Sequence, residues 1–384
     1  MIEEAGVLPL LFLGDNMFNK QYREWKRNIS YDAKKYLTPV TVQFELTSRC
    51  NFDCKMCYVH NQDSNRLKNK ELSTEQWKNI MDQAFDNGMM FAVLTGGECL
   101  LREDFKELYL HLWNKGVFIM VLSNGFLFDD QMLAFFKEYP PEGIQFSIYG
   151  SSEEGYLHVT GHTGFSKVLA SATKIIENKI PFTFALTCNS YIANDYISII
   201  KFAKEHKYPL SVAELMILPK RDSPEETEHF LEQDDLVRLA TEHRLIYGPV
   251  CAPEAIPDIV HIEGRTPSKG VTCTAGTSYA FITWEGNMYP CNALMECGGV
   301  SLLEMPFDVA WKETVQKASQ ILRPVECEGC AYTKACPKCI ILRTESLYSG
   351  HCNPDSCELT KRLVAAGVKK LDTPTQDDED DIIH

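Results

Sequence analysis

Between residues 41 and 218, short apolar runs alternate with longer segments that repeat apolar residues at the helical period. The short runs predict strands at 42–46, 91–95, 117–123, 143–149, 181–187 and 210–218. The longer segments predict helices at 72–88, 104–116, 127–139, 164–179 and 193–207, and Ser73 is the expected N-cap of the first of them. Strands separated by helices of this length are joined by right-handed crossovers into a parallel sheet. The pattern fits an open doubly wound sheet or an incomplete (β/α) barrel.

Outside this alternation the pattern changes. A mixed-charge segment at 21–37 predicts a helix that caps the sheet, and a charged loop with an amphipathic helix follows residue 218. Residues 248–270 are rich in proline and glycine, as in a linker. The cysteine-rich segment from 273 to 357 has little periodicity, which is typical of chains held together by metal more than by an apolar core.

The chain therefore divides into predicted parts with different compositions. They are an N-terminal extension (1–40), an α/β core (41–247), a cysteine-rich domain (248–362) and a solvated acidic tail (363–384).

Residues that carry chemistry lie where the predicted strands end. In chain order they are Cys50, Cys54 and Cys57, then Gly96-Gly97-Glu98, Ser123-Asn124-Gly125, Ser147 with Tyr149, and Cys188-Asn189. The carboxyl ends of parallel strands meet at one edge, which is the active-site face of barrels and open α/β sheets. Glycine and asparagine also form turns for conformational reasons. Five consecutive strand ends of this kind predict an active site at this edge.

Composition narrows the class of protein. The 384 residues are 45% hydrophobic, enough for a globular core, and the net charge of −15 argues against a nucleic-acid partner. The N-terminus lacks a basic start and a cleavage site, and no stretch approaches the roughly 20 apolar residues of a membrane span. We therefore expect no membrane association and a reducing, cytoplasmic location. There, 15 cysteines are more typical of metal sites than of disulfides.

The first cysteines have the spacing C-x3-C-x2-C, one ligand short of a closed zinc site. Three thiolates on a [4Fe–4S] cubane would leave one iron open to another molecule. Together with the aromatic Tyr58 that follows, this loop resembles the signature of the radical SAM enzymes. The resemblance implies that Cys50, Cys54 and Cys57 ligate the cluster and that S-adenosylmethionine (SAM) chelates its fourth iron.

Further positions follow from the same resemblance. Gly96, Gly97 and Glu98 match the GGE segment that meets the SAM amino group. Ser147 is similar to the ribose contact, and Asn189 is placed to approach SAM from the fifth strand. Where the family has proline after GGE, this chain has Cys99, which puts a thiol near the site.

The C-terminal half resembles the SPASM extension of this family, so the expected fold is a partial (β/α)6 TIM-type barrel with a C-terminal iron–sulfur domain. The resemblance implies two auxiliary [4Fe–4S] clusters, three in all. The outer cluster would be bound by Cys327, Cys330, Cys336 and Cys357. Cys273, Cys291 and Cys339 would bind the inner one. For the fourth inner ligand, Cys297 is the first choice, Cys352 and Cys251 follow, and an open iron is the remaining option; a zinc ribbon is the alternative for the whole set.

Such enzymes are oxidoreductases that cleave SAM to a 5′-deoxyadenosyl radical, and those with both halves mostly act on peptides. The first hypothesis is a maturase that forms a thioether or carbon–carbon cross-link in a ribosomally made peptide. A sulfatase-maturase-like enzyme is less favoured, because Asn292 stands where that family has an aspartate base. Epimerisation would need a hydrogen donor, for which Cys99 and Cys188 are candidates. A non-catalytic metal-binding protein is the alternative from another class.

The expected partners are a precursor peptide and a flavodoxin- or ferredoxin-type electron donor. About 40 residues precede the first strand, too few for a winged-helix leader-binding domain. Leader recognition is therefore expected from a separate protein, from the SPASM half, or not at all.

Overall fold

The computed structural model describes residues 20–59, 70–213, 218, 228–247 and 266–371. In this part of the chain one sheet of nine strands has the order β6-β5-β4-β3-β2-β1-β7-β8-β9. The strands are β1 Thr41–Glu45, β2 Phe91–Thr95, β3 Phe118–Ser123, β4 Gly143–Ser147, β5 Phe182–Thr187, β6 Leu210–Ala213, β7 Tyr279–Ile282, β8 Asn287–Tyr289 and β9 Val300–Ser301. Pairing is parallel from β6 to β7, and the last two strands add an antiparallel edge.

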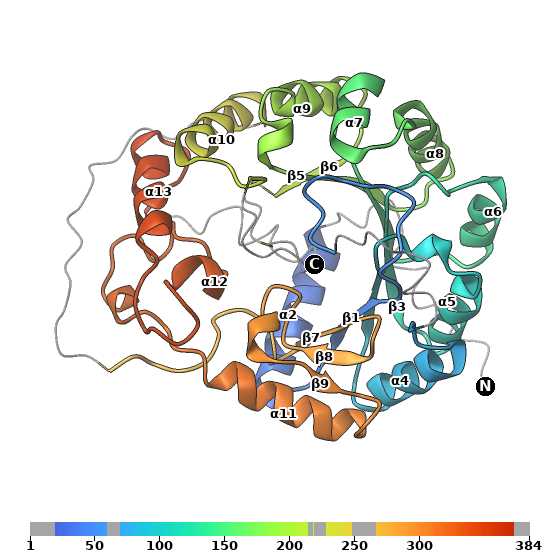
Figure 1. Cartoon of the computed structure of the whole chain (residues 1–384), viewed down its shortest axis with the longest axis horizontal. Coiled ribbons are helices and arrows are strands. Elements are labelled where there is room, and N and C mark those ends of the chain that lie inside the picture. The colour runs from blue at the N-terminus through green and yellow to red at the C-terminus, as the bar shows by residue number, and fades with distance from the viewer. Residues whose placement is uncertain (1–19, 60–69, 214–217, 219–227, 248–265, 372–384) are drawn as a thin grey trace.

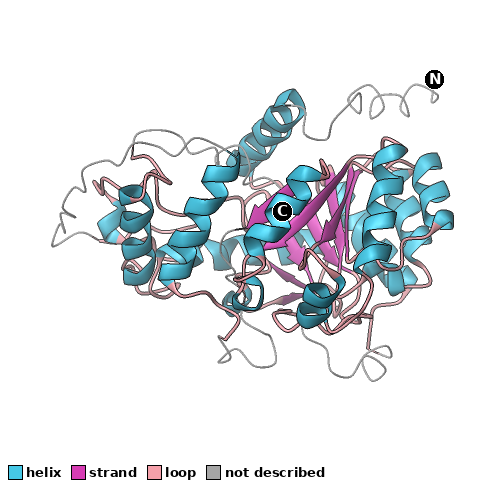
Figure 2. Cartoon of the chain, turned by 90° about the horizontal axis from the view of Figure 1, so that it is seen from above, coloured by secondary structure: helices cyan, strands magenta, loops and turns pink. Residues whose placement is uncertain are grey.

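The strand order decides between the two predicted architectures. Strands β1 to β6 are neighbours in chain order, without the reversal that marks a doubly wound sheet. Every crossover therefore runs in the same direction and places its helix on the same side of the sheet. Figure 1 shows these helices as an outer ring around the strands, and the turned view of Figure 2 shows strands enclosed between helices. The fold is the predicted partial barrel.

Most predicted helices are present, close to their expected bounds. They include α2 Lys20–Tyr36, α4 Thr74–Asp86, α5 Phe105–Trp113, α6 Asp130–Glu138, α8 Phe165–Glu177, α9 Tyr196–Glu205 and α10 Gln233–Tyr247. Ser73 caps α4 as predicted, in a capping box in which Ser73 and Gln76 bond each other's backbone N–H groups. The sequence did not predict α7 Glu153–Thr160, although Ser152 is its N-cap.

The two faces of the barrel strands differ in chemistry. On β1, Val42 and Phe44 belong to the main hydrophobic core, whereas Gln43 and Glu45 alternate with them and face the barrel interior. Interior positions on the other strands are Val93 and Thr95, Met120 and Leu122, Gln145 and Ser147, Thr183, Ala185 and Thr187, Ser211 and Ala213, and Tyr279 and Phe281. TIM-barrel interiors are normally filled by bulky branched residues. The interior positions on β4 to β6 are instead small or polar, and most of them are only partly buried.

Helix α2 closes the amino ends of the strands, as predicted for a cap. The Trp25 ring packs edge-on against Phe91 and Phe118, with ring centroids 5.8 and 5.7 Å away. Those two residues begin β2 and β3, opposite the edge that carries the cysteine loop. A buried ion pair of 2.6 Å between Lys26 and Glu142 fixes the same helix.

The C-terminal region differs from its prediction in two ways. It has an apolar core of its own, and its strands β7 to β9 continue the barrel sheet through β1. It also contains the helices α11 Phe307–Ser319, α12 Ile340–Arg343 and α13 Pro354–Ala365. Strands of two to four residues are too short to show a period, which is why the sequence suggested little structure here. The expected boundary after residue 362 falls inside α13.

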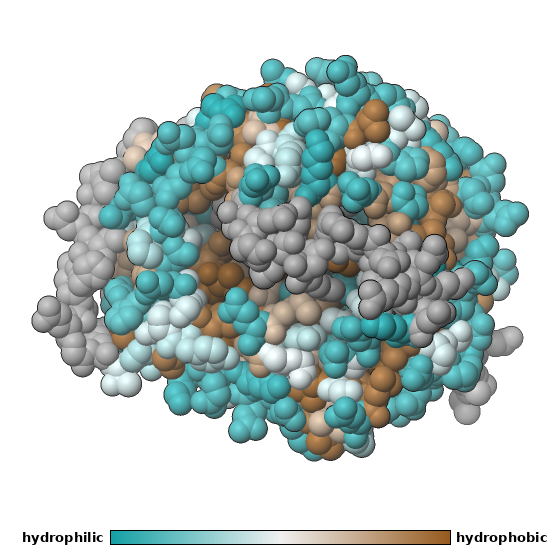
Figure 3. Space-filling view, viewed as in Figure 1, coloured by the Kyte–Doolittle hydropathy of each residue, from teal (hydrophilic) through white to brown (hydrophobic). Residues whose placement is uncertain are grey.

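This region also completes the ring of helices. Helix α11 packs against α4, and α13 packs against α10, so the C-terminal segment fills the gap between the last and first barrel helices. In the space-filling view, the rim of this face is mostly hydrophilic and hydrophobic residues show mainly inside it (Figure 3). No helix among the described residues has the length and apolar character needed to cross a membrane.

Candidate functional site

The cysteine loop after β1 is held by backbone hydrogen bonds on two sides. Gly97 N–H donates to Thr47 O at 2.8 Å, and Glu98 N–H donates to Arg49 O at 2.8 Å. From the other side, the loop donates to the end of α7, with Asp53 N bonded to Thr160 O at 3.1 Å. The position of the loop is therefore set by the segment after β2 and by the end of α7, and not by a metal alone.

The three thiols of this loop lie close enough to influence one another. Burial raises the pKa of the Cys50 thiol to about 12, and nearby Glu98 and Cys57 add to this. Burial likewise raises the pKa of Cys54, to which Cys57 and Cys50 contribute. A group of buried thiols that repel one another as thiolates needs a bound cation to be ionised. The loop therefore fits the [4Fe–4S] cluster that Cys50, Cys54 and Cys57 were predicted to hold.

The predicted GGE segment lies directly against this loop. A Cβ atom on Gly96 would lie 2.5 Å from Thr47 O, and one on Gly97 would lie 2.4 Å from Arg49 O. Real Cβ atoms do not approach backbone so closely, so both positions require glycine. The two glycines let the strand-2 loop seat the residues that precede Cys50.

Glu98 is fully buried and connects the ends of β2 and β3. Its carboxylate accepts from Ser123 Oγ at 3.0 Å, Asn124 N at 2.7 Å and Leu100 N at 3.0 Å. Burial raises the pKa of Glu98, and these hydrogen bonds oppose the rise. The side chain of Asn124 extends to Cys50 Sγ at 3.7 Å. The side chain of Glu98 therefore joins the ends of β2 and β3, and a contact between the GGE segment and a SAM amino group stays a prediction.

A charged cluster that the sequence did not reveal supports the same loop. Arg49 binds Glu71 through two contacts of 2.8 and 3.0 Å. Arg102 binds Asp104 and donates to the backbone oxygen of Leu46 at 3.1 Å. Since Arg49 and Leu46 flank the end of β1, the cluster braces the chain just before Cys50. The sequence did not point to Glu71, because it belongs to no motif; it lies just after residues 60–69, which are outside the described part of the chain.

The end of β4 brings a tyrosine to the cysteine loop. Tyr149 forms side-chain hydrogen bonds with Thr187 and Ser147. Burial raises the pKa of Tyr149, and the nearby Cys54 and Cys57 thiols raise it further. Ser147, the predicted ribose contact, is thus at the interior mouth beside the cluster loop. Tyr149 was visible in the sequence as a polar strand end but was given no role there.

Three predicted positions make contacts away from the proposed site, as Asn189, Cys99 and Cys188 show. Asn189 has its side-chain oxygen bonded to Tyr191 N at 3.1 Å and its amide bonded to Thr187 O at 3.0 Å, so it caps a turn. Cys99 is 0% exposed, with Sγ 3.3 Å from Leu122 O, and Cys188 is 2% exposed in the same hydrophobic core. Thiols in these positions have no exposed path to a substrate. The structure thus does not favour either cysteine as a hydrogen donor.

The inner auxiliary set is brought together as predicted for three of its members. Burial raises the pKa of Cys291 to about 12, and the neighbouring Cys273 and Cys339 contribute to the rise. Cys297 interacts with Tyr348, Glu296 and Lys317 and packs against the same small apolar core as Cys273 and Cys291, so its role as the fourth ligand stays a prediction. Cys251 lies outside the described residues. The buried Tyr279 connects this set with the barrel, because its hydroxyl bonds Gln43 on β1 and lies near Cys291.

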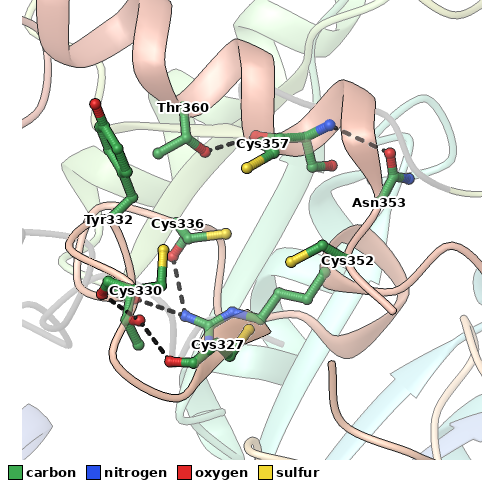
Figure 4. A pocket seen from close by; sticks show the side chains of 11 residues that line it. Cys327, Cys330, Tyr332, Cys336, Cys352, Asn353, Cys357 and Thr360 are labelled. Carbon is green, nitrogen blue, oxygen red and sulfur yellow. Dashed lines mark hydrogen bonds between the residues drawn. The ribbon is translucent and has the colours of Figure 1, made fainter. Parts of the chain in front are cut away.

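The outer auxiliary set lines one pocket. Its walls contain Cys327, Cys330, Cys336 and Cys357, as predicted, together with Cys352. Figure 4 shows the sulfur atoms around a common space. Cys352, a candidate for the inner cluster, therefore belongs to the outer pocket. Among the described residues, no three His, Cys, Asp or Glu side chains converge on a point for one metal ion. Thiols that surround a space suit a cluster, in which each binds a different iron, better than one zinc.

Helix α7, whose end is bonded to the cysteine loop, makes a pH-dependent contact in its first turn. Glu153 accepts from Ser166 N at 2.8 Å, and this bond with those from Gly164 and Phe165 lowers the pKa of Glu153 to about 2. A lowered pKa stabilises the fold above the ordinary value near 4.5, and that contribution is lost as the pH falls toward about 2. We expect the protection of the Ser166 amide, which is its intrinsic exchange rate divided by the observed rate at the same pH, to fall as the pH falls through this window. Hydrogen exchange measures it, and Glu153→Gln should remove the pH dependence; an unchanged profile in that variant would contradict the assignment.

Comparison with known proteins extends these observations. Residues 44–233 match the model of the Radical SAM superfamily. Curated relatives include the AdoMet-dependent heme synthase of Methanosarcina barkeri, 24% identical over 325 residues that cover 78% of this chain and 91% of that protein. The PqqA peptide cyclase of Xanthomonas euvesicatoria is 27% identical over 313 residues, which cover 76% and 80%. Streptococcus suis SuiB bound to precursor peptide SuiA has a TM-score of 0.61 at 15% identity, over 86% of this chain and 80% of that one.

Proposed function

This chain is a radical SAM enzyme, and on that premise we propose that it oxidatively cross-links a ribosomally made peptide through a thioether or carbon–carbon bond. The observation that carries the proposal is the set of polar, partly buried residues that face the barrel interior, with thiol sets beside them. Cys50, Cys54 and Cys57 would hold the [4Fe–4S] cluster, which together with SAM would supply the radical chemistry that abstracts hydrogen from an unactivated carbon. The chain's own residues hold the substrate, exclude water and fix the target hydrogen.

A cross-link removes two hydrogens from the peptide, so a second electron must leave the substrate after the first hydrogen. Cys273, Cys291 and Cys339 would hold a cluster whose chemistry is electron acceptance. Tyr279 spans the short distance between Gln43 in the barrel interior and the Cys291 side of this set. Auxiliary clusters placed in this way support an oxidative outcome over a redox-neutral one.

The barrel interior also supports a peptide. Gln145 pairs in register with Leu122 on the interior face, and its Oε1 atom has no hydrogen-bond partner among the described residues. A buried polar atom of this kind is normally satisfied, and a peptide backbone offers the donor it lacks. The names of the Xanthomonas relative and of the SuiB complex likewise refer to peptide substrates.

Two alternative reactions, epimerisation and formylglycine formation, are supported less well than cross-linking. Epimerisation requires an accessible hydrogen donor, and Cys99 and Cys188 are both buried in the core. Formylglycine formation would need a base at the position of Asn292, which is a neutral amide in this chain. An amide at this position does not take up a proton as a carboxylate does.

A second candidate is a reaction on a haem precursor. It is favoured by the heme synthase relative, whose alignment covers 91% of that protein. A tetrapyrrole would use the same radical chemistry and the same oxidative auxiliary set. The two candidates differ in substrate and therefore in the product that is measured.

The test uses anaerobically reconstituted full-length enzyme with SAM and a reduced flavodoxin. One reaction contains a candidate precursor peptide encoded beside the gene, and the other contains a haem-precursor tetrapyrrole. We expect the peptide to lose the mass of two hydrogens, with fragmentation placing the new bond. A peptide of unchanged mass that gains deuterium from solvent would indicate epimerisation. Conversion of the tetrapyrrole with an unmodified peptide would overturn the proposal in favour of the second candidate.

A further inference from the structure

The side chain of Asn124 connects the end of β3 to the first cysteine of the loop after β1. Its Nδ2 atom donates to Cys50 Sγ at 3.7 Å and to Asn51 Oδ1 at 2.8 Å. We propose that Asn124 is a positioning residue for the [4Fe–4S] cluster implied at this loop, and that its amide donates a hydrogen bond to the Cys50 thiolate and so favours the reduced cluster. The inference goes beyond the proposed function, because it concerns this cluster and not the substrate.

The hydrogen bonds around Asn124 decide which end of its amide faces Cys50. Asn124 Oδ1 accepts from Phe126 N–H at 3.0 Å. A flipped amide would place its NH2 group against that N–H group, so two donors would face each other. An amide nitrogen carries two hydrogens. The bond to Asn51 accounts for one of them, which leaves the other for the sulfur of Cys50.

The position of Asn124 is fixed by the fold without help from iron. Asn124 N–H donates to Glu98 Oε2 at 2.7 Å, and Glu98 is 0% exposed. Gly125 N–H donates to Ser123 Oγ at 2.9 Å. A Cβ atom on Gly125 would lie 2.5 Å from a ring carbon of Phe146, and the φ there is +78°, so only glycine forms this turn without strain. The turn therefore holds the amide in place before any cluster is bound.

The bond from Asn124 differs in origin from the other hydrogen bond to the same sulfur. Cys50 Sγ also accepts from Phe52 N–H at 3.4 Å, which is a contact within the loop. Asn124 lies 74 positions from Cys50 in the chain and reaches it from β3. Hydrogen bonds to cluster sulfurs stabilise the negative charge that reduction adds, and so raise the reduction potential. A higher potential makes it easier for an electron-donor protein to reduce this cluster.

The experiment uses the full-length enzyme, reconstituted anaerobically and without SAM. Redox titration followed by electron paramagnetic resonance gives the midpoint potential of the loop cluster, whose signal is the one absent from Cys50→Ala/Cys54→Ala/Cys57→Ala. Asn124→Asp keeps the acceptor for Phe126 N–H and loses the amide hydrogens, whereas Asn124→Ala loses both. We expect both variants to keep their iron and to have a more negative potential, with a shift in Asn124→Asp at least as large as in Asn124→Ala.

Ser123→Ala is the matched control for the turn. Ser123 lies beside Asn124 and donates to Glu98, but the hydrogen bonds to Cys50 come from other residues. We expect this variant to lose stability and to keep the potential of the loop cluster. A second readout compares two reductants. In the Asn124 variants, 5′-deoxyadenosine formation should fall by a larger factor with reduced flavodoxin than with titanium(III) citrate, because the stronger reductant compensates for a lower potential.

Several outcomes would overturn the assignment. An unmoved potential in Asn124→Asp would remove the hydrogen-bond role, and loss of iron from both Asn124 variants would make the amide a requirement for cluster assembly instead. An equal shift in Ser123→Ala would attribute the effect to the turn. Asn51 Nδ2 is buried without a hydrogen-bond partner among the described residues. A larger shift in Asn51→Ala than in Asn124→Ala would therefore make Asn51 the donor.

The potential and the iron content are measured without a substrate. A wild-type enzyme that modifies no peptide would therefore end the proposed function and leave this inference standing.

Discussion

Replacing Gly97 with alanine is expected to abolish SAM cleavage and to strip iron from the site at Cys50, Cys54 and Cys57. The new methyl group would lie 2.4 Å from Arg49 O and 2.6 Å from Ser48 O, and both are backbone atoms. They cannot rotate away, so the segment that precedes Cys50 must move. Gly97 N–H would then lose its 2.8 Å bond to Thr47 O. Iron content, visible absorbance and 5′-deoxyadenosine production measure the result.

Gly116→Ala is the matched control for Gly97→Ala. Gly116 has a φ of +78°, so alanine there is strained, by about 1 kcal/mol, but its Cβ would meet no atom within 4 Å. We expect this variant to lose some stability and to keep its iron and its SAM cleavage. If Gly97→Ala retained full iron and activity, the close seating of the two loops would not be needed for the site.

Replacing Glu98 with alanine is expected to have the second largest effect. The change leaves the Ser123 hydroxyl and the N–H groups of Asn124 and Leu100 without their acceptor. Each buried group left unpaired costs about 1–3 kcal/mol. We expect the free energy of unfolding to fall by about 3 kcal/mol or more on this basis. SAM cleavage should fall at least about 100-fold, because the ends of β2 and β3 lose their link. Chemical denaturation and product analysis measure the two effects.

Asp129→Ala is a suitable control for the loss of a capping carboxylate. Asp129 caps α6 through a 2.8 Å bond to Met132 N, away from the cysteine loop. Its loss should cost about 1 kcal/mol and leave SAM cleavage unchanged. Equal activity losses in Glu98→Ala and Asp129→Ala would mean that general destabilisation, and not the link at the site, explains the first result.

The sequence predicted the barrel well where elements are long and one face is apolar. Strand β2 was predicted at its observed bounds, and α4 with its cap, because Val93 and its neighbours form an apolar run and Ser73 precedes a clear helical period. Helix α7 was missed because Gly155 and polar residues weaken its pattern. In α11, the buried Phe307, Ala310, Trp311 and Thr314 do follow the helical period. Helix α11 was not predicted because it lies within the cysteine-rich segment, for which little periodic structure was expected.

For the candidate site, the spacing of the motifs predicted which residues take part but not the direction in which their side chains point. The loop of Cys50, Cys54 and Cys57 is local, so its spacing was sufficient. Cys352 meets Cys327 only because a bridge from Thr344 folds the chain back, and no short motif encodes that. Cys99 sits at a strand end, where access was expected, yet a turn directs its thiol to the carbonyl of Leu122. Which side of a strand end is exposed depends on packing that sequence position does not contain.

The place of β1 in the sheet has a consequence for how the protein is made. This strand leaves the ribosome well before β7, and it pairs on one side with β2. Its other edge pairs with β7, where Thr41 meets Tyr279 across more than half of the chain. Until β7 has been synthesised, that edge carries unpaired backbone groups, a template for aggregation. The two halves are therefore not separable domains, because a chain cut before Tyr279 would lack the strand that pairs with β1. The nascent chain has to be protected from aggregation until β7 has been synthesised.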